Sequence, residues 1–264
     1  MEPADLTILP IKPDGTEMKL KREIHPNLPP IQSGQFGIVI AKVKSGKSTL
    51  ISNLLLSKHF YKDLFDMVYI ISNTINNDRT SRFLKEAFPC TCYDRYDDEI
   101  IKNIVEYQES FKSKKEQPFI AVICDDFAGI KKSSAIWNFI TRFRHYNCGL
   151  VLQSVQGFKL LPPVARNNAT FCLFGKNTNQ KELSKICDEY ADIYGGEQNF
   201  LRLFHQATEG QYNWLYLNLN ENPPHAYRNF TDRIWDGSHT KQSQDRFLLA
   251  SSSSDDNCDS TDDD

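Results

Sequence analysis

The chain of 264 residues has no apolar run that approaches the roughly 20 residues of a membrane-spanning helix. Its first residues, Met1 to Asp5, are acidic and lack the apolar segment of a secretory signal peptide. The pattern argues against a membrane-spanning or secreted protein, and we expect one that acts inside a cell.

The sequence also lacks the paired cysteines of a disulfide framework or a zinc site. Its seven cysteines are odd in number and scattered, and Cys90 and Cys92 have no second pair at zinc spacing. Cys124, Cys148 and Cys172 lie in or beside apolar runs, where a free thiol behaves as a small hydrophobic group. A reducing compartment is therefore expected.

Positive charge is absent from residues 251–264, which carry six aspartates. Removing these six charges from the net charge of −3 leaves a body of +3. A Ser/Asp segment of this kind is typical of a disordered, solvating tail. The first 33 residues, in contrast, are rich in proline. We expect an N-terminal extension or arm at 1–33, one domain at 34–237 and a disordered acidic tail at 238–264.

Apolar runs alternate with helical patterns through the middle of the chain. Hydrophobic residues make up 40% of the sequence, which suits one α/β domain with a well-developed core. The runs Phe36–Ile40 and Met67–Ile71 predict strands, and the uninterrupted apolar run Phe119–Cys124 predicts a strand buried on both faces of a parallel sheet. Tyr212–Leu219 is expected to be the last strand. The alternation predicts a doubly wound α/β sandwich of three layers with a mainly parallel central sheet.

The segment 41–49 is the most informative part of the sequence. It lies between the strand-like run Phe36–Ile40 and a helical stretch at 47–56. A strand, then G-x-x-x-x-G-K-[ST], then a helix is the pattern of the phosphate-binding loop, although Ala41 stands where the first glycine usually stands. The expected nucleotide-binding residues are Ala41, Lys42, Val43, Lys44, Ser45, Gly46, Lys47, Ser48 and Thr49.

Each part of this loop has a chemical role toward a triphosphate. Backbone N–H groups at a helix N-terminus bind anions, and Gly46 allows the backbone to approach a phosphate closely. Lys47 is expected to reach the β- and γ-phosphates, and the hydroxyl of Ser48 to hold Mg²⁺. The sequence therefore predicts a site for ATP and Mg²⁺.

Two acidic residues follow the buried strand Phe119–Cys124. An aspartate at the end of such a strand lies beside the phosphate loop in P-loop enzymes, and we expect Asp125 to hold Mg²⁺ through water. Asp126 is placed to activate the attacking water as a general base. A simple turn after a strand is the alternative for these two residues taken alone.

Polar residues near a third central strand are the remaining site candidates. Gln153 or Gln156 is expected to hydrogen-bond the γ-phosphate or the attacking water, and we favour Gln156 because the strand is predicted to end near Gln153. Arg144 and Arg166 are candidates for an arginine finger, which stabilises the charge of the transition state. The sequence does not choose between the two arginines.

Several motifs in combination resemble those of one protein family. They are Gly37–Ile40 leading into Ser45–Thr49, Val122–Asp126, Arg144–Asn147 before a strand, Gln156, and Leu161–Asn168. In this combination the chain, over roughly residues 34–190, resembles the genome-packaging ATPases of large and mid-sized double-stranded DNA viruses. These form the poxvirus-like branch of the FtsK–HerA superfamily, and similar proteins occur in virophages and Polinton-like elements. Ala41 for glycine and Asp126 for the frequent glutamate are departures from the family pattern.

The resemblance implies a RecA/FtsK-like P-loop NTPase fold and a motor that pumps duplex DNA into a preformed capsid using ATP. It further implies a homo-oligomeric ring, a pentamer or hexamer, with capsid or portal-vertex proteins as partners. The location implied is the host-cell site of virion assembly, or the virion itself. Lys131, Lys132 and Lys159 are candidates for gripping the DNA backbone through its phosphates.

Three other functions are consistent with the phosphate loop at this point. A nucleotide or small-molecule kinase would need an Arg-rich lid, which the segment after Leu152 lacks. A cellular or plasmid DNA translocase would share the mechanism but usually carries additional domains. A nucleotide-binding assembly factor with little turnover is kept open by Asp126, because its shorter side chain holds water more loosely than glutamate.

Overall fold

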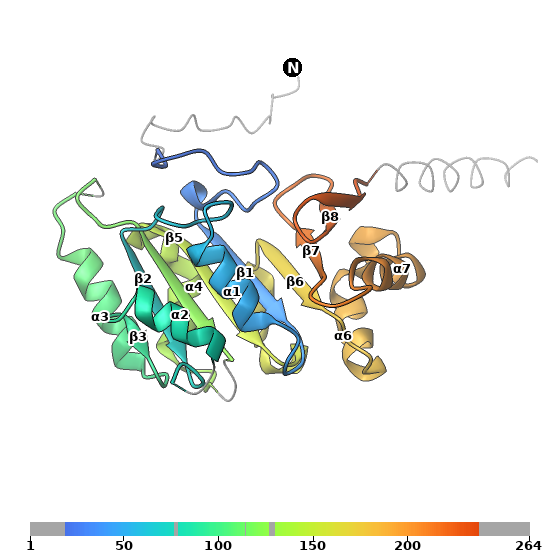
Figure 1. Ribbon diagram of the computed structural model, residues 1–264, viewed down its shortest axis with the longest axis horizontal. Helices are drawn as coiled ribbons and strands as arrows, with labels where there is room; N and C mark the ends of the chain where they lie inside the picture. Colours follow the sequence, from blue (N-terminus) through green and yellow to red (C-terminus); the bar gives the residue numbers. More distant parts are fainter. Residues whose placement is uncertain (1–18, 77–78, 114, 127–129, 238–264) are drawn as a thin grey trace, which may run out of the picture.

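A computed structural model describes residues 19–76, 79–113, 115–126 and 130–237 (Figure 1). In these ranges the chain forms one nine-stranded sheet with the order β3-β2-β4-β5-β1-β6-β7-β8-β9. The strands are β1 (Gln35–Ile40), β2 (Met67–Ser72), β3 (Cys92–Tyr93), β4 (Ile120–Asp125), β5 (Cys148–Val155), β6 (Phe171–Gly175), β7 (Trp214–Asn218), β8 (His225–Arg228) and β9 (Asp232–Trp235).

Helices connect the strands and cover both faces of the sheet. They are α1 (Lys47–Leu56), α2 (Arg79–Ala87), α3 (Asp98–Glu109), α4 (Ala135–Arg142), α5 (Pro163–Asn168), α6 (Gln180–Tyr190) and α7 (Glu197–Ala207). Short 3₁₀ turns are η1 (Ile31–Ser33), η2 (Phe143–Tyr146), η3 (Phe158–Leu160) and η4 (Ala191–Tyr194). No helix among the described residues combines the length and apolar character that crossing a membrane requires.

The six strands from β3 to β6 in this order run parallel, which brings their carboxyl ends to one edge of the sheet. β1 lies between β5 and β6, and β5 lies between β1 and β4. Every residue of β1, β4 and β5 is buried, as expected for central strands covered on both faces. The residues that directly follow β1, β4 and β5 therefore lie close together at the middle of this edge.

Two hydrophobic cores, one on each face, complete three layers. One core packs α1 and α2 against residues such as Val39, Ile70 and Ile123. The other packs α3 to α7 against the opposite side chains of the same strands, including Ile38 and Val122 (Figure 1). The predicted three-layer α/β sandwich with a mainly parallel sheet, the P-loop NTPase fold, is confirmed.

The last part of the sheet differs from the prediction. The strand expected at Tyr212–Leu219 is shorter, Trp214–Asn218, and is followed by two further strands, β8 and β9. β7, β8 and β9 extend the sheet in antiparallel fashion beyond β6. Tyr212 lies outside the strand, in a turn, with a φ of 60°. The expectation that Tyr212 begins the last strand is therefore wrong.

The described part of the expected N-terminal extension packs on the domain. Leu28 and Ile31 are buried in the core that contains α1. The hydroxyl of Tyr61 donates a hydrogen bond to the carbonyl oxygen of Pro29 across 2.9 Å. The expected acidic tail at 238–264 and the first 18 residues of the extension lie outside the described residues.

Candidate nucleotide-binding site

The phosphate loop leaves β1 at Ile40 and enters α1 at Lys47. Two residues turn the chain through left-handed conformations, Lys44 with a φ of 63° and Gly46 with a φ of 90°. Gly46 is the N-cap of α1, and its carbonyl oxygen accepts the first helical hydrogen bond from the N–H of Leu50 at 2.8 Å. The preceding N–H groups of the first turn face the loop, which is the arrangement that binds phosphate.

The alanine at the usual first glycine position is accommodated by a neighbouring strand. Ala41 is buried, and a Cβ added to Gly175 of β6 would lie only 2.7 Å from the Cβ of Ala41. The methyl group of Ala41 therefore occupies space that the absent side chain of Gly175 leaves open. The departure from the motif is compensated locally, and the loop keeps its course.

Lys47 lies inside the loop, with only 8% of its surface exposed. Its ammonium donates hydrogen bonds to the carbonyl oxygens of Ala41, at 2.8 Å, and Lys42, at 3.2 Å. Burial lowers the pKa of Lys47, while the carboxylates of Asp126 and Asp125 act in the opposite direction. The charged amine is thus held where a phosphate can receive it.

Asp125, at the end of β4, lies against the start of α1. Its Oδ1 accepts a hydrogen bond from the hydroxyl of Ser154 at 2.8 Å, and its Oδ2 lies 3.4 Å from the hydroxyl of Ser48. Burial raises the pKa of Asp125, and the charge on Asp126 adds to this rise. Hydrogen bonds from Ser154 and Ser48 and the charge on Lys47 counteract it.

Asp126 and Gln156 close the other side of the site. Asp126 has a φ of 52°, and its Oδ1 accepts a hydrogen bond from Nε2 of Gln156 at 2.8 Å. Thr74, from the turn after β2, lines the same space, and its hydroxyl lies 3.2 Å from that of Ser72. Gln156 is therefore the glutamine that the fold brings to the candidate base.

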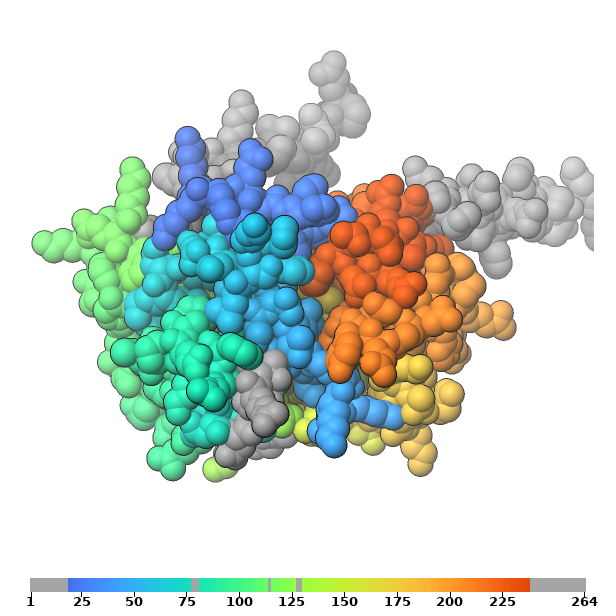
Figure 2. Space-filling model, in the orientation of Figure 1, coloured from blue at the N-terminus to red at the C-terminus, as the bar shows by residue number. Residues whose placement is uncertain are grey.

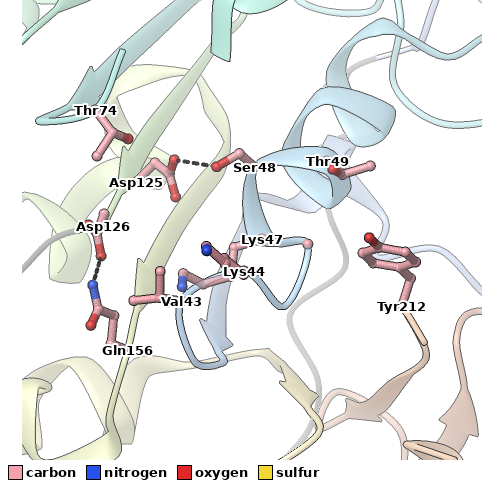
Figure 3. Close-up of a pocket in the computed structure, with 11 residues that line it drawn as sticks. Val43, Lys44, Lys47, Ser48, Thr49, Thr74, Asp125, Asp126, Gln156 and Tyr212 are labelled. Atoms are coloured by element: carbon pink, nitrogen blue, oxygen red, sulfur yellow. Dashed lines mark hydrogen bonds between the residues drawn. The ribbon is translucent and has the colours of Figure 1, made fainter. Parts of the chain in front are cut away.

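These groups surround one cavity of about 540 Å³. Figure 3 shows Lys47 and Ser48 between Asp125, Asp126 and Gln156 on one side and Tyr212 on the other. The lining residues are Val43, Lys44, Gly46, Lys47, Ser48, Thr49, Thr74, Asp125, Asp126, Gln156 and Tyr212.

Three residues of the predicted phosphate loop do not line the cavity: Ala41, Lys42 and Ser45. The amine of Lys42 instead donates a hydrogen bond to the hydroxyl of Thr178 at 2.8 Å.

Gln153 is not part of this cavity. The strand β5 continues to Val155, so Ser154 points toward Asp125 and Gln153 points to the opposite face of the sheet. Gln153 is 2% exposed, and among the described residues neither its amide nitrogen nor its amide oxygen has a hydrogen-bond partner. The alternation of side chains along a strand places it away from the nucleotide site.

The two candidate arginines lie outside the cavity as well. Arg144 is exposed on η2 and donates from Nε to the carbonyl oxygen of Gly34 at 3.2 Å. Gly34 precedes β1, so Arg144 lies at the edge of the sheet opposite the phosphate loop. Arg166 on α5 forms an ion pair with Glu189 at 2.6 Å, and its guanidinium lies 5.1 Å from the ring centre of Phe158.

Three lining or supporting residues were not predicted from the sequence. Ser154 lies within an apolar strand, and the face of the sheet to which its hydroxyl points becomes clear only when the end of the strand is known. Thr74 follows a strand at the carboxyl edge of the sheet, a position that could have marked it as a candidate. Tyr212 carries no motif, and its role depends on a turn that the sequence pattern assigned to a strand.

The donor set fits a nucleoside triphosphate and Mg²⁺. Hydroxyl and carboxylate oxygens are the ligands that Mg²⁺ prefers, and Ser48 and Asp125 place one of each side by side. The buried ammonium of Lys47 and the N-terminus of α1 provide the positive potential that phosphates require.

The fold and this cavity define the chain as a P-loop NTPase by architecture. No protein-family model matches the sequence. The chain belongs to the family of the uncharacterized protein 075L of Invertebrate iridescent virus 6, with 30% identity over 185 residues, which cover 68% of this chain and 69% of that protein. Protein 088R of Invertebrate iridescent virus 3 is 25% identical over 228 residues, 82% of this chain and 81% of its own length.

Solved structures with some similarity include two nucleotide complexes. The genome packaging NTPase B204 of Sulfolobus turreted icosahedral virus 2, in complex with AMP, has 20% identity and a TM-score of 0.49, covering 74% of this chain and 96% of that chain. The pCW3 conjugation coupling protein TcpA with ATPγS has 14% identity and a TM-score of 0.45, and the match covers 85% of this chain and 66% of that chain. At TM-scores below 0.5, these similarities do not bear on the function of this chain.

Proposed function

We propose that the chain is a Mg²⁺-dependent ATPase that drives double-stranded DNA into a preformed capsid during assembly of a virus particle. One observation carries the ATPase part of this proposal. The phosphate loop and the carboxylates of Asp125 and Asp126, which are far apart in sequence, line one cavity. Hydrolysis of a triphosphate needs both a phosphate cradle and an acidic group that handles metal and water.

The residues divide the chemistry between them. Lys47 would exchange its carbonyl acceptors for phosphate oxygens, and Ser48 and Asp125 would hold Mg²⁺. When bound, Mg²⁺ neutralises charge on the β- and γ-phosphates. Asp126 would accept the proton of the attacking water, and Gln156 would hold the carboxylate of Asp126 in position through its hydrogen bond.

The DNA-handling part of the proposal rests on the motif resemblance, on the viral origin of the relatives and on the distribution of charge. Lys131 and Lys132 are exposed after the Asp125-Asp126 pair. Lys159, after β5, lies near Lys185, which lowers the pKa of Lys159. Glu182, which forms an ion pair with Lys185 at 3.5 Å, counteracts this effect, and a DNA phosphate would be a second acceptor for the two amines.

A ring of five or six copies would bring an arginine of one copy to the nucleotide site of the next. Arg166 is held by Glu189 of its own chain, whereas Arg144 is exposed at the edge opposite the phosphate loop. Arg144 is therefore the better candidate to reach the cavity of an adjacent copy. Capsid or portal-vertex proteins would anchor such a ring at the site of virion assembly.

The test is ATPase activity of the purified protein with and without long duplex DNA. We expect Mg²⁺-dependent hydrolysis that long DNA stimulates, and loss of hydrolysis in Lys47→Ala. Activity in Lys47→Ala equal to that of the wild type would refute the site. If DNA does not change the rate of hydrolysis, and the native mass shows that the protein stays a monomer, a kinase or another P-loop activity would be favoured.

A further inference from the structure

Tyr212 is an exposed aromatic residue at one end of the nucleotide cavity. It lies in the turn between α7 and β7, and 64% of its surface is accessible to solvent. Among the described residues that line the cavity, it is the one with an aromatic side chain. Ligand pockets are commonly lined by aromatic side chains together with a small number of polar groups.

The two ends of the cavity carry different side chains, as Figure 3 shows. Asp125, Asp126 and Gln156 lie on one side, and Tyr212 lies on the other, beyond Lys47 and Thr49. The acidic side is where the terminal phosphate and the attacking water must be. The nucleoside end of a bound triphosphate therefore points toward Tyr212.

The ring of Tyr212 rests against the loop that binds phosphate. A Cβ added to Gly46 would lie 2.7 Å from Cδ1 and 3.2 Å from Cε1 of Tyr212, so the ring edge touches the loop backbone. In Figure 2 the blue surface of the N-terminal part of the domain adjoins the orange surface of the segment around this turn. Because one edge of the ring meets the loop while most of its surface is exposed, a planar ring can lie on its face.

The turn that carries Tyr212 is fixed by hydrogen bonds of its neighbouring residues. Tyr212 adopts a φ of 60°, which is rare for a bulky residue and costs conformational energy. Hydrogen bonds hold the flanking residues: Asn213 donates to the carbonyl oxygen of Glu209, and Asn229 donates to Oδ1 of Asn213 at 3.1 Å. The backbone N–H of Trp214 donates to Oδ1 of Asn229, also at 3.1 Å. Strain held by such bonds is characteristic of ligand-contacting positions.

We propose that Tyr212 is the stacking platform for the base of the bound nucleoside triphosphate. This inference rests on the proposed function of the site and specifies its ligand further. Stacking on an aromatic ring tolerates any base, because every base has a π-face. A larger ring system buries more of the tyrosine, so the site favours purine over pyrimidine nucleotides and distinguishes little between adenine and guanine.

The test compares binding of a non-hydrolysable ATP analogue with binding of inorganic triphosphate, both with Mg²⁺, by titration calorimetry. Tyr212→Ala is expected to weaken binding of the ATP analogue by about 5- to 150-fold, the range that corresponds to loss of one stacked base. Binding of inorganic triphosphate is unchanged, because it has no base. Tyr212→Phe keeps the ring and retains wild-type affinity for both ligands.

Two further variants serve as controls. Tyr212→Gly accepts the positive φ without strain and should show the same selective loss as Tyr212→Ala. Tyr107→Ala removes an exposed tyrosine from α3 that is not among the lining residues, and it should leave both affinities unchanged.

The possible failures are distinguishable. Equal affinity of wild type and Tyr212→Ala for the ATP analogue would overturn the stacking role and leave the phosphate site intact. An equal loss for both ligands would also overturn it, since Tyr212 would then support the loop rather than the base. A wild-type protein that binds neither ligand would overturn the nucleotide site itself, and the stacking role with it.

Discussion

Nε2 of Gln156 donates a hydrogen bond to Oδ1 of Asp126 across 2.8 Å, joining the loop after β5 to the residue after β4. Asp126 is held in a left-handed conformation at this point, with a φ of 52°. One carboxylate oxygen is therefore occupied, and we expect the other to accept a hydrogen bond from the attacking water. The bond links the predicted general base to the loop of the neighbouring strand.

Asp126→Asn is the direct test of this base. The substitution keeps an oxygen that can accept from Gln156 but removes the ability to take a proton, so ATP hydrolysis should fall by about 10²- to 10⁴-fold. Nucleotide affinity should change little, because Lys47 and the loop are untouched. Steady-state ATPase rates and calorimetric binding would measure the two effects. Hydrolysis that survives in Asp126→Asn would place the base elsewhere.

Gln156→Ala should act through Asp126 and not on the nucleotide directly. Without the amide, the carboxylate loses its orientation, and we expect a lower turnover number with nearly unchanged affinity for ATP. The double variant with Asp126→Asn should be no slower than Asp126→Asn alone, because both changes remove one function. Independent, multiplying losses would show that Gln156 has a separate role.

Asp125→Asn should stabilise the ligand-free protein while it removes Mg²⁺-dependent activity. Burial raises the pKa of Asp125, so its ionised form costs folding free energy at neutral pH. The stability that this group contributes is present below its unfolded pKa and is lost as pH rises through the raised, folded value. The variant should therefore melt higher at pH 7, by about 2–4 °C for each kcal/mol relieved. The gain should shrink as the pH is lowered, and a lower melting temperature at pH 7 would contradict the account.

Nucleotide binding in the presence of Mg²⁺ should weaken on acidification, because a proton on Asp125 excludes the cation. Two variants should move this loss in opposite directions. Asp126→Asn removes a charge that raises the pKa of Asp125 and should shift the loss to lower pH. Ser154→Ala removes a hydrogen bond that lowers this pKa and should shift the loss to higher pH. Binding titrations across a pH series would show both shifts; shifts of the same sign would not fit.

Ala41 and Gly175 should be energetically coupled. In Gly175→Ala the new Cβ would lie 2.7 Å from that of Ala41 and 3.1 Å from Cζ3 of Trp214, and overpacking of this kind costs about 1–3 kcal/mol. Adding Ala41→Gly removes one of the two clashes and should restore part of the stability. Urea denaturation of the two single variants and the double variant would measure the coupling. Additive changes would show that the two residues do not share space.

The elements nearest the phosphate loop could be predicted from sequence with little error. The helix at 47–56 has the expected bounds, because Gly46 caps its start and apolar residues repeat at helical spacing. The strand before Asp125 was recognisable as a continuous apolar run. In both places local pattern and tertiary burial agree, so the sequence alone carried the information.

Residues whose role depends on an element's exact end could not be predicted. The strand containing Gln153 was expected to end there, but it continues to Val155 and turns Gln153 to the far face of the sheet. Strands β8 and β9 are four residues each and follow a segment rich in asparagine and proline, so no pattern marked them. Tyr212 was assigned to a strand because its apolar neighbours suggested one, while the turn is fixed by hydrogen bonds of Asn213 and Asn229.

Lys47 has given up its rotamer freedom before any nucleotide arrives, because its amine is already anchored to two backbone carbonyls. Immobilising a mobile lysine costs up to about 2 kcal/mol, and here that loss belongs to folding and not to association. A phosphate that binds here would meet a cation that is already positioned, so part of the entropic cost of binding has been met during folding.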